Sequence, residues 1–347
     1  MCGGRAEDTA LARSEEPSLR VVFMGSDAFS VPSLEACLAQ CEVVAVYTQP
    51  DRRSGRGRRR LSRSPVKEVA LSLGLPVEQP EKFDKRCSER LREFEPDLTV
   101  VAAYGQLLPR HALAAARVDS INVHASLLPR HRGAAPVAAA ILAGDAEAGV
   151  TVMKLRPELD AGEIIICGGG RRAQRAAAVA DDETAGELAA RLATLGGELL
   201  ADVLPAFADG SVTYELQDDA RATYAPMLRK SDGEIDWSQP AGDVLRRIRA
   251  MTPWPGACTE LQTAGAAPVR VTVLRARACG SGIGGRPGQI HVRPGPQLLA
   301  CTGGGWLELL EVKPAGRKAM AAAEFIRGCR PLRDTSGRDG DCWFGSA

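Results

Sequence analysis

Three polar side chains between residues 120 and 160 have the types needed to act on a carbonyl group. Asn122 and His124 stand two positions apart in the segment Ser-Ile-Asn-Val-His at 120–124, which is typical of a short strand. Side chains at i and i+2 lie on one face of a strand, so the amide and the imidazole point the same way. Asp160 follows in a turn after a second predicted strand, 149–155. Together these groups could polarise a carbonyl, transfer a proton and orient the imidazole, although a polar pair at a strand end can also be purely structural.

The elements before this stretch predict a parallel sheet that would position it. Residues 20–25 form an apolar strand, Pro32 suits the first turn of a helix, and 42–48 predict a second strand. This β-α-β order favours a right-handed crossover, with ligands outside the carboxyl ends of the strands. The first turn contains one glycine, Gly25, where a dinucleotide fingerprint needs three. A nicotinamide or flavin cofactor is therefore disfavoured.

Two apolar turns could line a ligand pocket near the polar trio. One follows a predicted strand at 98–103, where Gly105 permits close backbone approach and Leu107 and Leu108 could form a wall. The other is Ser-Leu-Leu-Pro at 126–129. For the first turn, an ordinary hydrophobic loop closure is the alternative interpretation.

Residues 51–67 are strongly basic. Seven arginines fall between positions 52 and 63 with no acidic residue among them, and glycines and prolines indicate a loop. A solvated surface loop and a phosphate-contacting loop are both compatible with this composition. If the segment binds RNA, affinity should fall as salt rises.

Composition bounds the remaining possibilities. A length of 347 residues predicts about two domains. With 44 basic and 43 acidic side chains, the net charge is +1, which excludes a uniformly basic protein. Ten cysteines lack zinc-like spacing, so we expect free thiols and no metal site. No apolar run approaches the ~18 residues that span a bilayer.

The rest of the chain predicts a long helix, a connector and a barrel. Thr184 and Glu187 have capping-box spacing ahead of a leucine-rich helix, whereas 168–175 show no clear pattern. Short strands between 257 and 312 predict a small barrel, followed by a last helix at 319–327. We therefore divide the chain into a loose extension (1–19), an α/β domain (20–208), a linker (209–236), a barrel domain (237–332) and a frayed tail (333–347).

With these segments in view, the sequence resembles the methionyl-tRNA formyltransferase family from about residue 20 to 332. Seven ordered segments carry the resemblance: VVFMGSDAFSVPSLEA; TQPDRRSGRG with SPVKE; PDLTVVAAYGQLLP; SINVHASLLPRHRGAAP; AGDAEAGVTVMKL with LDAGEII; KSDGEIDWSQPA with MTPWPGA; and LLEVKPAG with AEFIRG. It implies an α/β fold, with a Rossmann-like parallel-sheet formyltransferase domain followed by a small OB-like β-barrel.

The resemblance also implies a reaction and a site. A formyl group would pass from 10-formyltetrahydrofolate to the α-amine of methionyl-initiator tRNA, with no metal or nicotinamide. Its catalytic residues would be Asn122, His124 and Asp160. Its folate-binding residues would be Gln106, Leu107, Leu108, Ser126, Leu127, Leu128 and Pro129. Its tRNA-binding residues would be Arg52, Arg53, Arg56, Arg58, Arg59, Arg60 and Lys67, with further contacts from the barrel.

Several points stay open at this level. His131, Ala138, Ala139 and Met227 depart from the residues usual in the family. The acceptor could instead be glycinamide ribonucleotide, an amino sugar nucleotide or water, but a small acceptor needs neither the basic loop nor the barrel. The chain could also be a catalytically silent RNA-binding relative, but such a protein would not need the intact trio of Asn122, His124 and Asp160. We expect a monomer without membrane association in a bacterial cytoplasm, with an organelle as the alternative.

Overall fold

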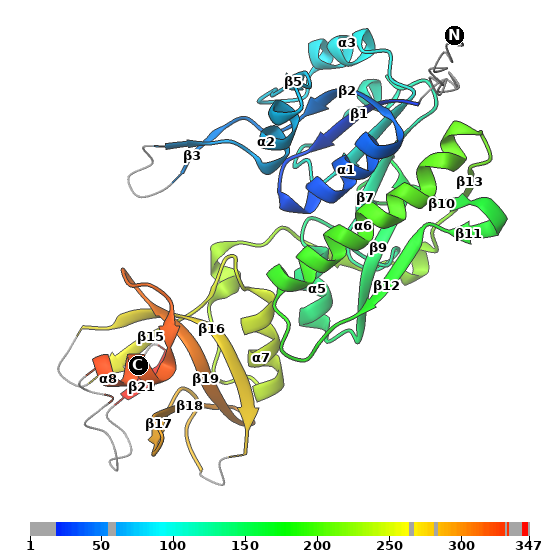
Figure 1. Ribbon diagram of the computed structural model, residues 1–347. Helices are drawn as coiled ribbons and strands as arrows, with labels where there is room; N and C mark the ends of the chain where they lie inside the picture. Colours follow the sequence, from blue (N-terminus) through cyan, green and yellow to red (C-terminus); the bar gives the residue numbers. More distant parts are fainter. Residues whose placement is uncertain are drawn as a thin grey trace, which may run out of the picture.

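The computed structural model describes residues 19–54, 60–263, 267–280, 284–329, 332 and 342–345. Figure 1 shows an α/β domain formed by the first half of the chain and a barrel formed by the C-terminal part. Within the described residues, no helix is both long enough and apolar enough to cross a membrane.

The α/β domain is built on a mixed sheet with strand order β11-β10-β9-β7-β6-β1-β2-β5. Five neighbouring strands run parallel: β1 (Arg20–Gly25), β2 (Glu42–Tyr47), β5 (Val77–Glu78), β6 (Leu98–Ala102) and β7 (Asp119–His124). An antiparallel part adds β9 (Glu147–Lys154), β10 (Ile164–Cys167), β11 (Arg171–Arg172), β12 (Gln174–Ala178) and β13 (Thr213–Glu215). The predicted Rossmann-like parallel sheet is confirmed.

The helices of this domain are α1 (Val31–Gln40), α2 (Pro65–Ser72), α3 (Lys85–Glu93), α4 (Arg110–Leu113), α5 (Pro136–Ala143) and α6 (Ala185–Ala208). Thr184 and Glu187 close the predicted capping box at the start of α6, and the leucine stripe behind it is largely buried. α1 and α6 pack closely, because a Cβ on Gly197 would lie 2.7 Å from the carbonyl oxygen of Pro32.

The prediction that residues 168–175 lack regular structure is partly wrong. After a short 3-10 turn (Gly168–Gly170), β11 pairs with β10 and β12 pairs with β9. The alanines and glycines of this segment have low intrinsic strand preference. Pairing with a buried neighbouring strand supplies the order that the local sequence does not indicate.

The second domain is a nearly closed antiparallel barrel, as predicted. Its strand order is β17-β18-β19-β16-β15-β21. The bounds are β15 (Ala257–Thr263), β16 (Val269–Cys279), β17 (Ile290–Arg293), β18 (Gln297–Thr302), β19 (Gly305–Pro314), β20 (Met320–Ala321), helix α8 (Ala322–Gly328) and β21 (Cys342–Phe344). The Phe344 N–H donates to the Gly288 carbonyl over 2.7 Å, which brings the two ends of the sheet together. Residues 342–344 therefore belong to the barrel, and the prediction of a frayed tail is wrong for them.

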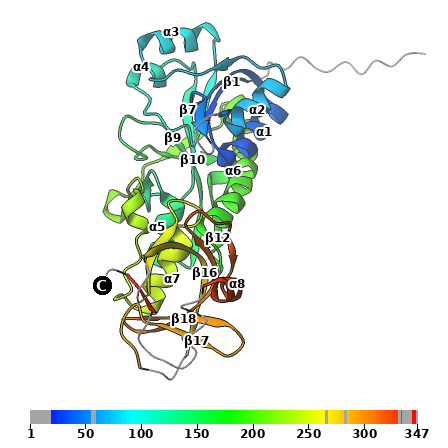
Figure 2. The same cartoon turned by 90° about the vertical axis from the view of Figure 1, so that its left-hand side faces the viewer.

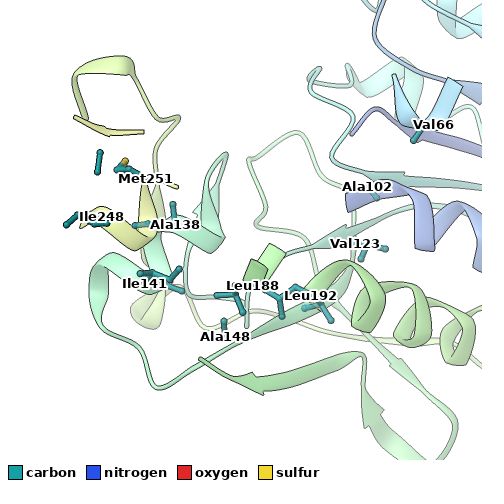
Figure 3. Packing of buried hydrophobic residues seen from close by; sticks show 14 of the residues in the cluster. Val66, Ala102, Val123, Ala138, Ile141, Ala148, Leu188, Leu192, Ile248 and Met251 are labelled. Carbon is teal, nitrogen blue, oxygen red and sulfur yellow. The ribbon is translucent and has the colours of Figure 1, made fainter. Parts of the chain in front are cut away.

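A continuous apolar core joins the two domains. Figure 3 shows it running from Val123 on β7, past Leu192 on α6 and Ile141 on α5, to Ile248 and Met251. Helix α7 (Ala241–Ala250) lies between α5 and the barrel strand β16 (Figure 2). Ala138, one of the departures from the family pattern, is buried in this core.

The connector between α6 and α7 carries four short elements. These are β13, a 3-10 turn at Asp219–Arg221, β14 (Tyr224–Ala225) and a second 3-10 turn at Lys230–Gly233. β13 joins the edge of the sheet beside β10, and β14 pairs in parallel with β8 (Arg132–Gly133). The connector is therefore hydrogen-bonded to the α/β domain at two separate places.

Candidate active site

The imidazole of His124 lies at the carboxyl end of β7 with a partner near each ring nitrogen. It is 6% exposed. Its Nε2 lies 3.0 Å from the backbone carbonyl oxygen of His131. A carbonyl can only accept, so Nε2 carries a hydrogen and donates. Nδ1 faces Oδ2 of Asp160 at 3.7 Å. This distance is too long for a direct hydrogen bond, so Nδ1 keeps its bonding capacity for a substrate atom.

Asp160 lies in the turn between β9 and β10 in an uncommon backbone conformation. Its φ is +50°, in the left-handed region that non-glycine residues rarely adopt. Its Oδ2 accepts a hydrogen bond of 2.8 Å from the Gly133 N–H. The structure thus brings His124 and Asp160 together across the end of the sheet.

Asn122 is half-buried two positions before His124 on the same strand. It is the only asparagine in the chain, and its side-chain amide makes no hydrogen bond among the described residues. An amide in this situation is available to a bound substrate.

The Ser-Leu-Leu-Pro turn is anchored to the antiparallel part of the sheet. The Leu128 N–H donates to Thr151 Oγ1 over 3.2 Å, and Gln174 donates to the Leu128 carbonyl over 2.7 Å. The Ser126 hydroxyl donates to the Arg130 carbonyl over 2.6 Å. The side chains of this turn differ in exposure: Ser126 and Leu128 are buried, whereas Leu127 and Pro129 are half-buried.

The second predicted wall, residues 106–108, follows the neighbouring strand β6. Since β6 and β7 are parallel, both turns lie at the same edge of the sheet. The side chain of Gln106 accepts from the Phe83 N–H over 2.9 Å and donates to the Pro80 carbonyl over 2.8 Å. Leu107 is 79% exposed and Leu108 is half-buried, so Leu107 is the more available to a ligand.

The ends of the basic segment form a hairpin rather than the expected loop. β3 (Arg52–Ser54) pairs with β4 (Arg60–Ser62), and β3 points away from the main sheet in Figure 1. Arg52 is exposed and donates to Gln49 over 3.0 Å, whereas Arg56, Arg58 and Arg59 lie outside the described residues. Arg53 and Arg60 belong to the paired strands.

Lys67 ties the base of this hairpin to the domain. Its ammonium donates to both carboxylate oxygens of Asp51, over 2.9 and 2.8 Å, and to Gln79 over 2.6 Å. Hydrogen bonds from Lys67, then from Gln79, hold the pKa of Asp51 below its ordinary value. Lys67 therefore has an internal structural role, in addition to any contribution to the binding of a polyanion.

The contacts around His131 have no signal in the sequence. This residue has φ +57° and is 7% exposed, and its Nε2 lies 2.7 Å from Oδ2 of Asp145. Its backbone N–H donates to Thr223 Oγ1 over 2.8 Å, and its carbonyl receives the hydrogen bond from His124. Thr223 and Gln217 of the connector also contact the site. Both are polar residues in a polar segment without periodicity, so the sequence contains no signal that predicts these contacts.

Family profiles match most of the chain. The family described as Formyl transferase matches residues 19–204, and Formyl transferase, C-terminal domain, matches residues 227–330. A methionyl-tRNA formyltransferase from Methylococcus capsulatus is 44% identical over 313 residues, which cover 89% of this chain and 96% of the relative. One from Herpetosiphon aurantiacus is 44% identical over 317 residues, covering 90% and 99%.

Solved structures share the fold at low sequence identity. The sugar 3N-formyltransferase WlaRD, solved with dTDP and 5-N-formyl-THF, has a TM-score of 0.61 and 15% identity, covering 87% of this chain and 99% of that one. HypX from Aquifex aeolicus in complex with tetrahydrofolic acid has a TM-score of 0.58 and 16% identity, covering 89% and 47%.

Proposed function

The chain belongs to the methionyl-tRNA formyltransferase family, and on this premise we propose that it transfers the formyl group of 10-formyltetrahydrofolate to the α-amine of methionyl-initiator tRNA. The observation that carries the proposal is that Nδ1 of His124 faces Asp160, with Asn122 two positions earlier on the same strand, in a chain that aligns with its relatives through both domains.

Each group of the trio has a part in this reaction. The amine attacks the formyl carbon, a C–N bond forms, and the carbonyl oxygen becomes an oxyanion. The Asn122 amide and the Nδ1–H of protonated His124 donate hydrogen bonds to that oxygen. The Nε2 hydrogen bond to the His131 carbonyl fixes the ring so that Nδ1 faces the reacting atoms. The Asp160 carboxylate balances the imidazolium charge and accepts the amine proton through water.

Collapse of the tetrahedral intermediate then breaks the bond between the formyl carbon and N10 of the folate. N10 of the leaving folate takes up the proton that Asp160 accepted from the amine, and the formylated amine remains on the tRNA. Leu107, Leu127 and Pro129 provide exposed or half-buried apolar surface at this edge for the pterin side of the donor.

Two parts of the chain favour tRNA as the acceptor, because a small substrate would need neither of them. The basic hairpin and the barrel would contact the phosphates of a large polyanion, while net charge +1 keeps the attraction local. Folate turnover with methionyl-initiator tRNA, glycinamide ribonucleotide and an amino sugar nucleotide in parallel tests this choice. We expect transfer to the tRNA alone; transfer to a small amine without transfer to tRNA would refute the proposal.

Replacing Asn122 should have a large effect on rate. We expect Asn122→Ala to lower kcat by about 10²–10³-fold, because one oxyanion donor is removed. Asn122→Asp should be worse, since a carboxylate repels the oxyanion. Single-turnover transfer measures both, with Gln40→Ala at the exposed end of α1 as the amide control. Near-normal turnover of Asn122→Ala would exclude this role.

The single asparagine allows a direct binding measurement. Selective ¹⁵N-asparagine labelling gives one side-chain amide signal, that of Asn122. Adding 5-formyltetrahydrofolate, which is not turned over, should move that signal if the formyl group lies against the amide. An unmoved signal at saturating folate would place the formyl group elsewhere.

A further inference from the structure

Residues 217–225 of the connector, which we call the connector segment, lie directly against the candidate active site. The Arg132 N–H donates to the Thr223 carbonyl and the Ala134 N–H to the Ala225 carbonyl, each over 2.8 Å. Between them, Gly133 has φ +123°, and a Cβ there would lie 2.4 Å from the Ala225 oxygen. Only glycine permits this approach.

One side chain of the connector segment joins two parts of the site. Gln217 Oε1 accepts from Nε and Nη2 of Arg132, over 3.0 and 2.9 Å. Its Nε2 donates to the backbone carbonyls of Asp160, over 2.9 Å, and Gly162, over 2.6 Å. Arg132 is 3% exposed, so the buried guanidinium and the turn that carries Asp160 are held by the same amide.

The Asp160 turn depends on external support. A non-glycine residue in the left-handed region is strained and persists only where its surroundings fix it. The turn also packs tightly on β9, because a Cβ on Gly162 would lie 1.8 Å from the Lys154 oxygen. Gln217 fixes the carbonyls on both sides of Ala161, while the Gly133 N–H holds the Asp160 carboxylate. Both supports depend on the connector segment, since Gly133 itself pairs with Ala225.

The connector segment also reaches His124 through one intermediate. Thr223 Oγ1 accepts from the His131 N–H over 2.8 Å, and the His131 carbonyl accepts from His124 Nε2 over 3.0 Å. His131 has φ +57°, so its carbonyl direction depends on what holds its backbone.

We infer that Gln217 is a positioning residue that fixes Asp160 relative to the His124 imidazole. Thr223 fixes the orientation of His124 in the same way, through the backbone of His131. This inference rests on the proposed function. It makes the connector a part of the active site rather than a tether between domains. From residue 225 the chain continues through the 3-10 turn at Lys230–Gly233 and helix α7 to the first barrel strand, β15. The segment that contacts the site therefore also belongs to the connection between the two domains.

Two substitutions separate hydrogen bonding from shape at this position. Gln217→Met keeps the length of the side chain and removes its hydrogen bonds, while Gln217→Glu keeps the acceptor for Arg132 and sets a carboxylate against two carbonyls. We expect kcat to fall by roughly 10- to 100-fold in both, since a misplacement of about 1 Å can cost about 10² in rate. The KM for tRNA and for folate should change by less than about threefold, because Gln217 acts through Asp160 rather than on either substrate. Gln40→Ala is the control.

A spectroscopic readout tests positioning without the reaction. The chain has four histidines, so their ring signals can be assigned one by one from single variants. In Gln217→Met the His124 ring signals should shift while those of His291 in the barrel stay in place. Thr223→Val removes the hydroxyl that accepts from the His131 N–H and lies 3.5 Å from His131 Nδ1. It should also move the His124 signals, and it provides the test if the Gln217 variants do not fold.

The outcomes distinguish this inference from the function it rests on. Folded Gln217 variants with wild-type kcat, or with reduced kcat but unmoved His124 signals, would overturn the positioning role. Wild-type protein that fails to formylate methionyl-initiator tRNA, while Gln217→Met still moves the His124 signals, would overturn the proposed function and leave the positioning role intact.

Discussion

The basic segment at residues 51–67 and the connector at 209–236 differ in what their sequences indicate and in where they lie. The hairpin is conspicuous for its charge, yet its described ends point away from the sheet (Figure 1), held at the base by Lys67 and Asp51. The connector is ordinary in composition, yet Gln217 and Thr223 contact the active site.

The difference reflects two kinds of interaction. Attraction of a polyanion depends on the number of like charges, so composition alone indicates a candidate surface. Positioning depends on single hydrogen bonds with fixed geometry, which leave no compositional pattern. We therefore expect changes in the connector to alter kcat, and changes in the hairpin to alter the KM for tRNA and its salt dependence.

Among the substitutions that test this comparison, Gly133→Ala should have the largest effect, because it displaces the connector from the site. The new Cβ would lie 2.4 Å from a backbone oxygen, at a φ that alanine rarely adopts. We expect a loss of about 2–4 kcal/mol in the free energy of unfolding and roughly 10²-fold in kcat. Denaturant unfolding and formyl transfer measure the two.

Gly210→Ala is the matched control, since Gly210 has φ +71° but nothing within 4 Å of an added Cβ. We expect about 1 kcal/mol of backbone strain there and an unchanged kcat. Equal kcat losses in the two variants would show that connector docking at Gly133 has no special role.

Neutralising arginines of the basic segment should act on tRNA binding instead. For Arg58→Gln with Arg59→Gln, we expect the KM for tRNA to rise about tenfold and kcat to change little. The slope of log KM against log salt should fall by about 1 for each phosphate that the arginines no longer neutralise. The control is Arg171→Gln with Arg172→Gln on the edge strand β11, which removes the same charge elsewhere. Identical salt slopes in both pairs would assign the effect to net charge rather than to the hairpin.

Asp51→Asn should have the smallest effect. Lys67 lowers the pKa of Asp51 below its ordinary value of 3.8, so the ion pair stabilises the fold above that pH and loses its contribution as pH falls through the folded pKa. We expect the free energy of unfolding to fall by about 1 kcal/mol or less at pH 7. This loss should disappear once the pH is below the folded pKa of Asp51. Denaturant midpoints at several pH values test this, and a pH-independent loss would contradict the assignment.

Local sequence pattern was sufficient for the features that depend on burial, capping and residue spacing. Apolar runs predicted the parallel strands, Thr184 and Glu187 predicted the start of α6, and the types and spacing of Asn122 and His124 indicated a carbonyl-directed site. These features are visible because burial of one face and capping of a helix end leave periodic or fixed-spacing signals.

The partners of those groups, by contrast, are set by the folded chain. β12 and β21 form because distant strands supply hydrogen bonds that their own residues do not predict. The His124 imidazole is directed by the carbonyl of His131, and the Asp160 turn is held by Gln217. Each of these contacts joins residues that are brought together only by folding, and a hydrogen bond between single side chains and backbone carbonyls has no counterpart in sequence periodicity.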